Sequence, residues 1–159
     1  VETLTAAAPE PPPLSGDKFL WPVAAGRILM GFGPAAGGQQ NDGINIAAAE
    51  GTPVRAVENG VVAYAGNELR GFGNLLLIRH ADGWMSAYAH NETLLVKRGD
   101  TVKRGEIIAR VGKTGNVSEP QLHFELRRGT RAVDPMPYLG EGGSAITPAA
   151  SPGGRQDPG

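Results

Sequence analysis

Two histidines, His90 and His123, carry the side chains of this chain that are most able to do chemistry. Imidazole can bind a metal ion or move a proton near neutral pH. His123 lies in a stretch that alternates polar and apolar residues, so in a β-strand it would share one face with Gln121 and Glu125. By the same alternation, Tyr88 would share a face with His90. A single histidine on a strand face is more often an ordinary hydrogen-bonded residue than a ligand, so a site needs support from other segments.

A third segment, residues 41–45, reads Asn-Asp-Gly-Ile-Asn. Taken in chain order with the Tyr-Ala-His that ends at His90 and the Gln-Leu-His that ends at His123, it resembles the three motifs of the lysostaphin-type (LytM) zinc metallopeptidases. These enzymes cut peptide crosslinks in bacterial cell-wall peptidoglycan. Their first motif reads His-x-Gly-x-Asp, their second ends in Tyr-Ala-His, and their third reads His-x-His. The resemblance covers residues 19–139, most of the chain.

The chain departs from the family pattern at several chemically important positions. The first zinc-ligand histidine of the family falls on Asn41, and its ligand aspartate falls on Asn45. The third ligand falls on His123, which is a histidine here as well. Of the two catalytic histidines of the family, one falls on His90 and the other on Gln121. Both the metal site and the catalytic pair are therefore incomplete.

The donors that remain do not suit zinc. A catalytic zinc ion uses three protein ligands from imidazole, thiolate or carboxylate, with water in the fourth position. The amide oxygens of Asn41 and Asn45 carry no net charge, and the chain has no cysteine that could supply a thiolate. Without the metal, no water is brought to a pKa of about 7 for attack on a peptide bond. We therefore expect no metal, no other cofactor and no catalytic residues in this chain.

Three other residues could in principle rescue the site. Asp42 should point away from His123, because neighbours in an extended chain face opposite sides. Glu125 shares the face of His123 but lies two residues along, about 6–7 Å away. His80 precedes a predicted Asp-Gly turn and is interpreted as an ordinary strand-end histidine. A residual zinc-dependent peptidoglycan endopeptidase remains as an alternative.

Short alternating runs predict the elements that must position these residues. Turn signals such as Asn-Gly, Gly-Phe-Gly and Asp-Gly separate the runs, and no run has the apolar period of a capped amphipathic helix. The chain therefore predicts an all-β fold, and the resemblance implies the LytM peptidase-like form of it, an antiparallel sheet with short hairpins. The predicted strands span residues 27–32, 54–57, 60–64, 74–79, 84–90, 107–111 and 122–127.

Composition sets the boundaries of the predicted domain. With 159 residues and a net charge of −1, the chain suits one domain with flanking tails and carries no electrostatic footprint for nucleic acid. Residues 1–17 predict a Pro/Ala-rich linker, residues 18–139 the LytM-like domain, and residues 140–159 a disordered tail. No run of about 20 apolar residues predicts a membrane span. Because the chain begins at Val1, we interpret it as a fragment without its export signal and upstream domains.

The substitutions at the metal-ligand and catalytic positions of the family pattern most resemble those of the degenerate LytM-domain factors of Gram-negative bacteria. That resemblance implies a non-catalytic regulator in the periplasm, at the division site. It would activate N-acetylmuramoyl-L-alanine amidases, which split septal peptidoglycan so that daughter cells separate. A peptidoglycan-binding module without a regulatory role is the other alternative.

In either case the former active site would become a groove for a partner or for peptidoglycan, made of uncharged amides, imidazoles and one aromatic ring. The predicted groove residues are Asn41, Asn45, Tyr88, His90, Gln121 and His123.

Overall fold

The computed structural model describes residues 10–148, and it confirms the predicted all-β fold. The strands are β1 (Phe19–Leu20), β2 (Ala25–Met30), β3 (Gly33–Pro34), β4 (Gln40–Asn41), β5 (Ile44–Ala47), β6 (Pro53–Arg55), β7 (Gly60–Gly66), β8 (Asn74–Arg79), β9 (Trp84–Leu94), β10 (Thr101–Val102), β11 (Ile107–Val111), β12 (Gln121–Arg128), β13 (Arg131–Val133), β14 (Leu139–Glu141) and β15 (Ala145–Thr147). Short 3₁₀ segments lie at η1 (Ala36–Gly38), η2 (Ala81–Gly83) and η3 (Met136–Tyr138). Among the described residues, no helix is long and apolar enough to cross a membrane.

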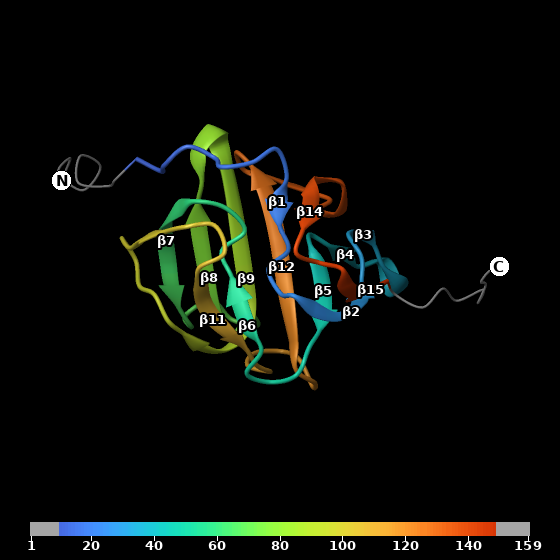
Figure 1. Ribbon diagram of the computed structural model, residues 1–159. Helices are drawn as coiled ribbons and strands as arrows, with labels where there is room; N and C mark the ends of the chain where they lie inside the picture. Colours follow the sequence, from blue (N-terminus) through green and yellow to red (C-terminus); the bar gives the residue numbers. More distant parts are fainter. Residues whose placement is uncertain (1–9, 149–159) are drawn as a thin grey trace.

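Most strands join one curled sheet that is mainly antiparallel, as the sequence predicts (Figure 1). Its main order is β10-β7-β8-β9-β12-β5-β2-β15, with β13 paired to β12, and β11 paired to both β6 and β9. The long strand β9 has β8 on one edge and β12 on the other, and its carboxyl end also pairs with β11. The strands β9 and β12, which carry His90 and His123, therefore lie side by side in the middle of the sheet.

The hydrophobic core lies between the β8-β9-β12 part of the sheet and the strands β6 and β11, which stand in front of it in Figure 1. Phe124 of β12 pairs with Tyr88 of β9, and both side chains are fully buried in this core. Leu122 and Leu126, on the same face of β12, are fully buried as well. Because side chains alternate along a strand, the polar residues of β12 are left on the opposite face of the sheet.

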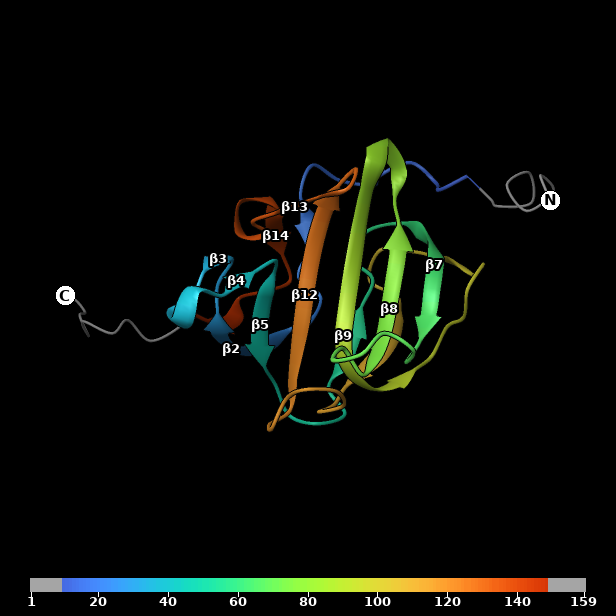
Figure 2. The same cartoon turned by 180° about the vertical axis from the view of Figure 1, so that it is seen from behind.

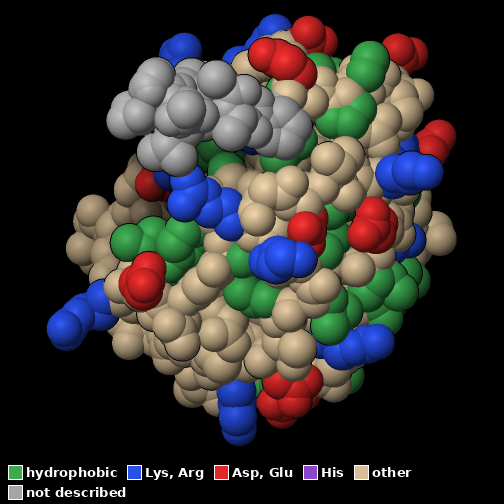
Figure 3. Space-filling model, turned by 90° about the vertical axis from the view of Figure 1, so that its left-hand side faces the viewer, with side chains coloured by type: hydrophobic (Ala, Val, Ile, Leu, Met, Phe, Trp, Pro, Cys, Tyr) green, Lys and Arg blue, Asp and Glu red, His purple; other side chains and the backbone are tan. Residues whose placement is uncertain are grey.

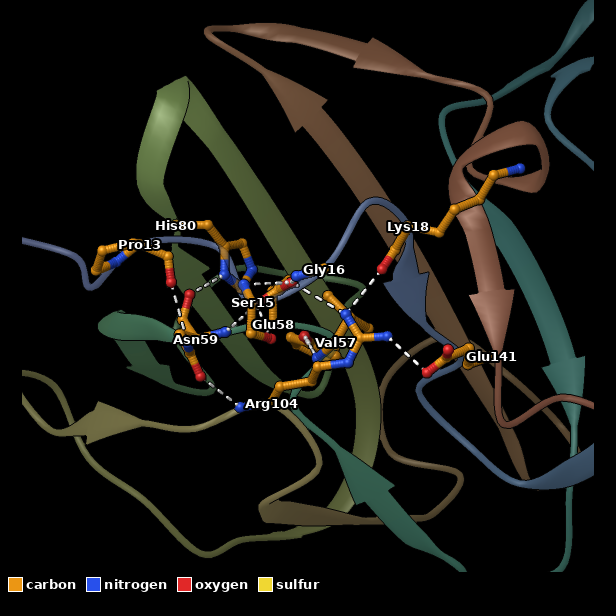
Figure 4. Close-up of polar contacts among 11 residues, drawn as sticks. Pro13, Ser15, Gly16, Lys18, Val57, Glu58, Asn59, His80, Arg104 and Glu141 are labelled. Atoms are coloured by element: carbon orange, nitrogen blue, oxygen red, sulfur yellow. Dashed lines mark hydrogen bonds and ion pairs between the residues drawn. The ribbon is translucent and has the colours of Figure 1, made fainter.

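Part of the predicted N-terminal linker is fastened to the domain (Figure 4). The side chain of Glu58 is 1% exposed, and it accepts hydrogen bonds from Ser15 N, Ser15 Oγ and Gly16 N at 2.9–3.0 Å. Arg104 Nη1 donates to the same carboxylate at 3.0 Å and to the carbonyl of Lys18 at 2.8 Å. The predicted linker boundary at residue 17 is therefore wrong, since residues 15 and 16 are bonded to the folded domain. Residues 1–9 of that linker lie outside the described residues.

The chain from Leu139 onward adds two strands to the domain. Strand β14 runs parallel to β1, and β15 runs parallel to β2. Arg55 Nη2 donates to the carbonyl of Gly142 at 3.0 Å, and Gly143 lies so close to Trp21 that a Cβ there would overlap the indole ring. The predicted disordered tail is therefore wrong for residues 140–148, because β1 and β2 supply backbone partners that the local composition does not reveal. Residues 149–159 lie outside the described residues.

The face of the molecule near β7 has mixed chemistry (Figure 3). Lysine and arginine side chains are scattered there among aspartate, glutamate and apolar side chains. This mixture agrees with the net charge of −1 and provides no broad field of one sign on the described part of this face.

Candidate functional site

Strand register places Asn45 next to His123 on the face of the sheet opposite the core, the side seen in Figure 2. Strands β5 and β12 are antiparallel, and Asn45 pairs directly with His123. On the other edge of β12, Ala89 of β9 pairs with His123. Directly opposed residues in antiparallel strands present their side chains on the same face. Ala89 is fully buried beside the imidazole.

His90 reaches this face because β9 contains a bulge. Asn74 of β8 pairs with Asn91 of β9, and Leu76 pairs with Tyr88. Between these two pairs β8 has one residue and β9 has two, so β9 carries one extra residue. The backbone of His90 is left-handed, with φ at 70°, which is uncommon for a residue other than glycine. The bulge therefore breaks the alternation of side chains along β9.

The His90 and His123 rings meet edge to face, with their planes at 61° and their centroids 6.2 Å apart. His90 Nδ1 lies 2.8 Å from the carbonyl oxygen of Thr114, an acceptor, so the proton must be on Nδ1. Burial lowers the pKa of His90, the hydrogen bond to Thr114 opposes this shift, and the charge of His123 reinforces it. The neutral form, with Nε2 as a hydrogen-bond acceptor, is therefore favoured.

Tyr88 does not line the groove, and its predicted place there is wrong. The side chain is fully buried, and its ring packs against Phe124 with centroids 5.5 Å apart. Its hydroxyl accepts hydrogen bonds from Ser86 Oγ at 2.8 Å and from the backbone N–H of Val57 at 3.2 Å. Burial raises the pKa of Tyr88, so the phenol stays neutral. Strict alternation predicts the side chains of Tyr88 and His90 on the same face of β9. The left-handed backbone of His90 puts them on opposite faces.

A network of amide hydrogen bonds occupies the positions where the family pattern has metal ligands. Asn41 Nδ2 donates to Asn45 Oδ1 at 3.1 Å and to the carbonyl of Gly31 at 2.9 Å. Asn45 Nδ2 donates to Gln121 Oε1 at 2.8 Å. His123 Nδ1 lies 3.2 Å from Asn45 Oδ1. Asn45 thus joins the other three side chains into one group.

The second ring nitrogen of His123 is held by Glu125. His123 Nε2 donates to Glu125 Oε2 at 2.9 Å, although the spacing of alternate strand positions predicts about 6–7 Å. That expectation is wrong for the side chains, because the long glutamate side chain bends along the strand. Arg127 Nη2 and Nε lie 2.8 Å and 2.9 Å from Glu125 Oε1. Burial opposes the charged form of Glu125, but hydrogen bonds and charges from His123 and Arg127 outweigh it and lower the pKa of this carboxyl.

Asp42 lies on the same side as His123, so the expectation that it points away is wrong. The chain bends between β4 and β5, and strict alternation does not hold across the bend. Gly43 allows this bend to pack against β12, since a Cβ at Gly43 would overlap the carbonyl of Phe124. Asp42 and His123 line one surface pocket, and Asp42 Oδ2 is 4.0 Å from Arg127 Nη2.

His80 is buried away from the groove. Its Nδ1 lies 2.7 Å from the carbonyl oxygen of Asn59, and its Nε2 lies 2.8 Å from Ser86 Oγ. Burial lowers the pKa of His80, which the bond to Asn59 only partly offsets. His80 therefore acts as a hydrogen-bonded core residue.

The groove formed by these residues is open and has a volume of about 350 Å³. Its lining includes every predicted groove residue except Tyr88. It also includes residues that the motifs did not identify, namely Met30, Gly71, Phe72, Asn116 and Val117. Most of these lie in loops, where there is no regular alternation from which the direction of a side chain could be predicted. The period of two along β12 could have identified Arg127 as a neighbour of Glu125 and His123.

These side chains do not fit a zinc ion. The two asparagine amides bond to each other, and His123 has a partner at each ring nitrogen. Within residues 10–148, no three His, Cys, Asp or Glu side chains are grouped so that they could hold a metal ion. The groove offers amide and imidazole hydrogen-bond donors and acceptors that already bond to one another, which suits a polar ligand better than a cation.

Comparison with known proteins gives consistent results. Residues 39–135 match Peptidase family M23. The chain is 52% identical over 126 residues to the cell division protein DipM of Caulobacter vibrioides, covering 77% of this chain and 20% of DipM. It is 47% identical over 119 residues to the murein hydrolase activator NlpD of Escherichia coli, covering 75% of this chain and 30% of NlpD. The catalytic domain of lysostaphin from Staphylococcus simulans is 34% identical with a TM-score of 0.67, covering 72% of this chain and 92% of the lysostaphin domain.

The chain thus spans less than a third of the length of DipM and of NlpD. The family match covers more than half of the chain and includes every groove residue from Asn41 to His123. The chain therefore belongs to peptidase family M23, with a LytM-type domain that is similar to parts of DipM and NlpD.

Proposed function

We propose that this chain is a non-catalytic LytM-domain regulator that activates N-acetylmuramoyl-L-alanine amidases in the periplasm of a Gram-negative bacterium. At the division site, the activated amidases would split septal peptidoglycan so that daughter cells separate. The names of two similar proteins support this proposal, since DipM is a cell division protein and NlpD is a murein hydrolase activator. Because the chain matches only 20% of DipM and 30% of NlpD, the role of those whole proteins enters here as part of the proposal.

The observation that carries the proposal is the amide network centred on Asn45. Hydrolysis by this family's chemistry needs a metal-bound water, and three charged or imidazole ligands to hold the metal. In this chain Asn41 directs an N–H donor to Asn45 Oδ1, so the former ligands satisfy each other. The groove of about 350 Å³ nevertheless remains open and is lined by donors and acceptors. It can therefore bind a polar segment of another protein without cutting it.

Activation requires more than binding. A ligand shifts an equilibrium only if it binds one of the two states more tightly. The groove must therefore bind the open form of the amidase better than its blocked form. We infer that groove acceptors outside these mutual bonds, such as Nε2 of His90, supply this preference by hydrogen-bonding a segment that is accessible only in the open amidase.

Dye release from labelled peptidoglycan tests the proposal. The chain alone, a purified N-acetylmuramoyl-L-alanine amidase from the same organism alone, and the two together are incubated with dye-labelled sacculi. We expect dye release above the amidase background only in the mixture. Treating the chain with a chelator and then removing the chelator should not change this stimulation. Release by the chain alone that is lost with a chelator would instead establish a zinc endopeptidase. Retention on sacculi without any stimulation would establish a peptidoglycan-binding module.

A variant at the groove locates the contact. Gln121→Lys should reduce stimulation by about tenfold or more, because a charge replaces an amide that lines the groove. Thr101→Lys is the matched control, since Thr101 is exposed on β10 at the far end of the sheet from β5. Both variants should unfold within a few degrees of the wild-type temperature. Equal stimulation by the two variants would place the contact outside the groove.

A further inference from the structure

An apolar pocket lies directly beside the polar groove. It has a volume of about 250 Å³ and shares Phe72 and His123 with the groove. Its apolar lining comes from the loop after β7 and from strands β8 and β9. The apolar residues are Leu69, Phe72, Leu75, Leu77 and Ala87. Because Phe72 and His123 line both, the groove and the pocket adjoin each other.

The pocket has a buried floor and an exposed apolar rim. Leu75 and Ala87 are 4% and 6% exposed, and they pack in a small cluster separate from the main core. Leu69 and Phe72 on the rim are 48% and 36% exposed. Exposing two large apolar side chains beside a recess costs free energy that burial under a partner would recover. The lining therefore favours an apolar occupant.

The charged side of the rim favours a cation next to that occupant. Glu125 is already engaged by Arg127 at 2.8 Å and by His123 at 2.9 Å. Asp42, whose side chain is 52% exposed, approaches Arg127 only to 4.0 Å. The Asp42 carboxylate is therefore the acidic group on this rim that can readily pair with a basic side chain of a ligand.

We propose that this pocket receives one large apolar side chain of the amidase, such as leucine or phenylalanine, with a lysine or arginine nearby that pairs with Asp42. This proposal rests on the proposed function and adds the chemistry of the segment that is recognised. A volume of about 250 Å³ is below the about 300–1,000 Å³ of pockets for whole small ligands, so it suits a single side chain. The stem peptide of peptidoglycan fits less well, because its methyl groups and carboxylates would leave an apolar pocket poorly filled.

A pair of leucine variants tests the apolar part. Leu69→Glu places a charge on the pocket rim, whereas Leu95→Glu makes the same change at a leucine that is equally exposed, 47% against 48%, but lies outside the pocket. We expect Leu69→Glu to weaken binding of the purified amidase by about tenfold or more. Leu95→Glu should bind like the wild type. The readout is the equilibrium dissociation constant in biolayer interferometry, with stimulation of dye release as a second measurement.

A pair of acidic variants tests the charge. Asp42→Asn should weaken amidase binding by a few-fold at low salt, and the difference should shrink as salt screens the ion pair. Glu50→Gln is the control, because Glu50 is exposed in the turn between β5 and β6 and lines neither the groove nor the pocket. It should leave affinity and salt dependence unchanged.

The outcomes separate this proposal from the proposed function. If the wild-type chain neither binds nor stimulates the amidase, the proposed function fails. If the wild type stimulates and Leu69→Glu matches Leu95→Glu, only the pocket proposal is overturned. The pocket proposal is also overturned if a purified disaccharide-tetrapeptide shifts the NMR signals of Leu69 and Leu77, and Leu69→Glu loses that binding while keeping amidase stimulation.

Discussion

His90 adopts a left-handed backbone, with φ at 70°, inside a β-strand. The conformation turns its ring toward the groove, although the residue is only 6% exposed, whereas Tyr88 points into the core and is fully buried. Left-handed conformations cost non-glycine residues about 1–3 kcal/mol, and asparagine tolerates them better than most. The backbone N–H of His90 donates to the carbonyl of Phe72 at 2.8 Å, which helps to hold the bulge.

Substitutions at His90 should therefore separate backbone strain from side-chain function. His90→Asn should change the free energy of unfolding by less than about 1 kcal/mol, because asparagine accepts positive φ. His90→Val should destabilise the domain by about 1–3 kcal/mol, because a β-branched residue does not. Urea denaturation gives both values from the midpoints at constant slope. Equal stability of the two variants would mean that the bulge does not persist in solution.

The residue types of the groove could be predicted from the sequence, but not all of its geometry. The alternation along β12 placed Gln121, His123 and Glu125 on one face, where the structure has them. The position of the Tyr88 side chain was predicted wrongly because no sequence pattern predicts a left-handed backbone at a residue other than glycine. Asp42 was misplaced because a bend follows β4 and interrupts the alternation.

At the scale of elements, the buried carboxylate of Glu58 fastens the segment before β1 to the turn between β6 and β7. Besides Ser15, Gly16 and Arg104, the backbone N–H of Asn59 donates to it at 2.9 Å. Burial works to raise the pKa of Glu58, but the hydrogen bonds from Ser15, Asn59 and Gly16 outweigh burial and lower it. These bonds could not be predicted, because a glutamate beside Asn-Gly resembles an ordinary turn residue.

The replacement Glu58→Gln should destabilise the domain by about 2 kcal/mol at pH 7, the usual range for hydrogen bonds to a charged group. Since the folded pKa lies below the unfolded value of about 4.3, this contribution is present above that pH and is lost as the pH falls through the folded pKa. The difference in free energy of unfolding between Glu58→Gln and the wild type should therefore become smaller at acid pH. Denaturation curves at several pH values measure it.

A matched control exists at Glu106, which is exposed and accepts one backbone hydrogen bond, from Lys103 N at 3.0 Å. Glu106→Gln should lower the free energy of unfolding by less than about 1 kcal/mol and leave the pH dependence of stability unaltered. Hydrogen exchange at the amides of Ser15 and Gly16 should quicken only in Glu58→Gln. Unchanged exchange there would contradict the attachment of the segment.

Strands β14 and β15 give a further test at the same scale. A chain that ends after residue 139 loses β15, all of β14 except Leu139, and the ion pair between Glu141 and Arg104 at 3.2 Å. It also uncovers Trp21, which lies against Gly143. We expect its thermal midpoint to lie several degrees below that of a chain that ends after residue 148. Identical melting curves for the two truncations would show that these strands add no stability.

At the scale of the whole molecule, an all-β fold with short hairpins could be predicted because the strands alternate and the turns carry glycine. Strands β8 and β11 have the predicted bounds, residues 74–79 and 107–111. Pairing over long sequence distances could not be derived from the pattern, as β2 with β15 illustrates. The same fold can hold a metal or an amide network, so the function follows from the groove residues rather than from the architecture.

The zinc content of the purified chain tests whether amides bonded to one another replace the metal centre. The chain is loaded with excess zinc, desalted and measured by elemental analysis, beside a variant that combines Asn41→His with Asn45→Asp. We predict far less than stoichiometric zinc in the wild type and about one zinc per chain in the variant, since His123 then completes three ligands. About one zinc per wild-type chain, lost in His123→Ala, would show that the amides do not prevent these side chains from holding zinc.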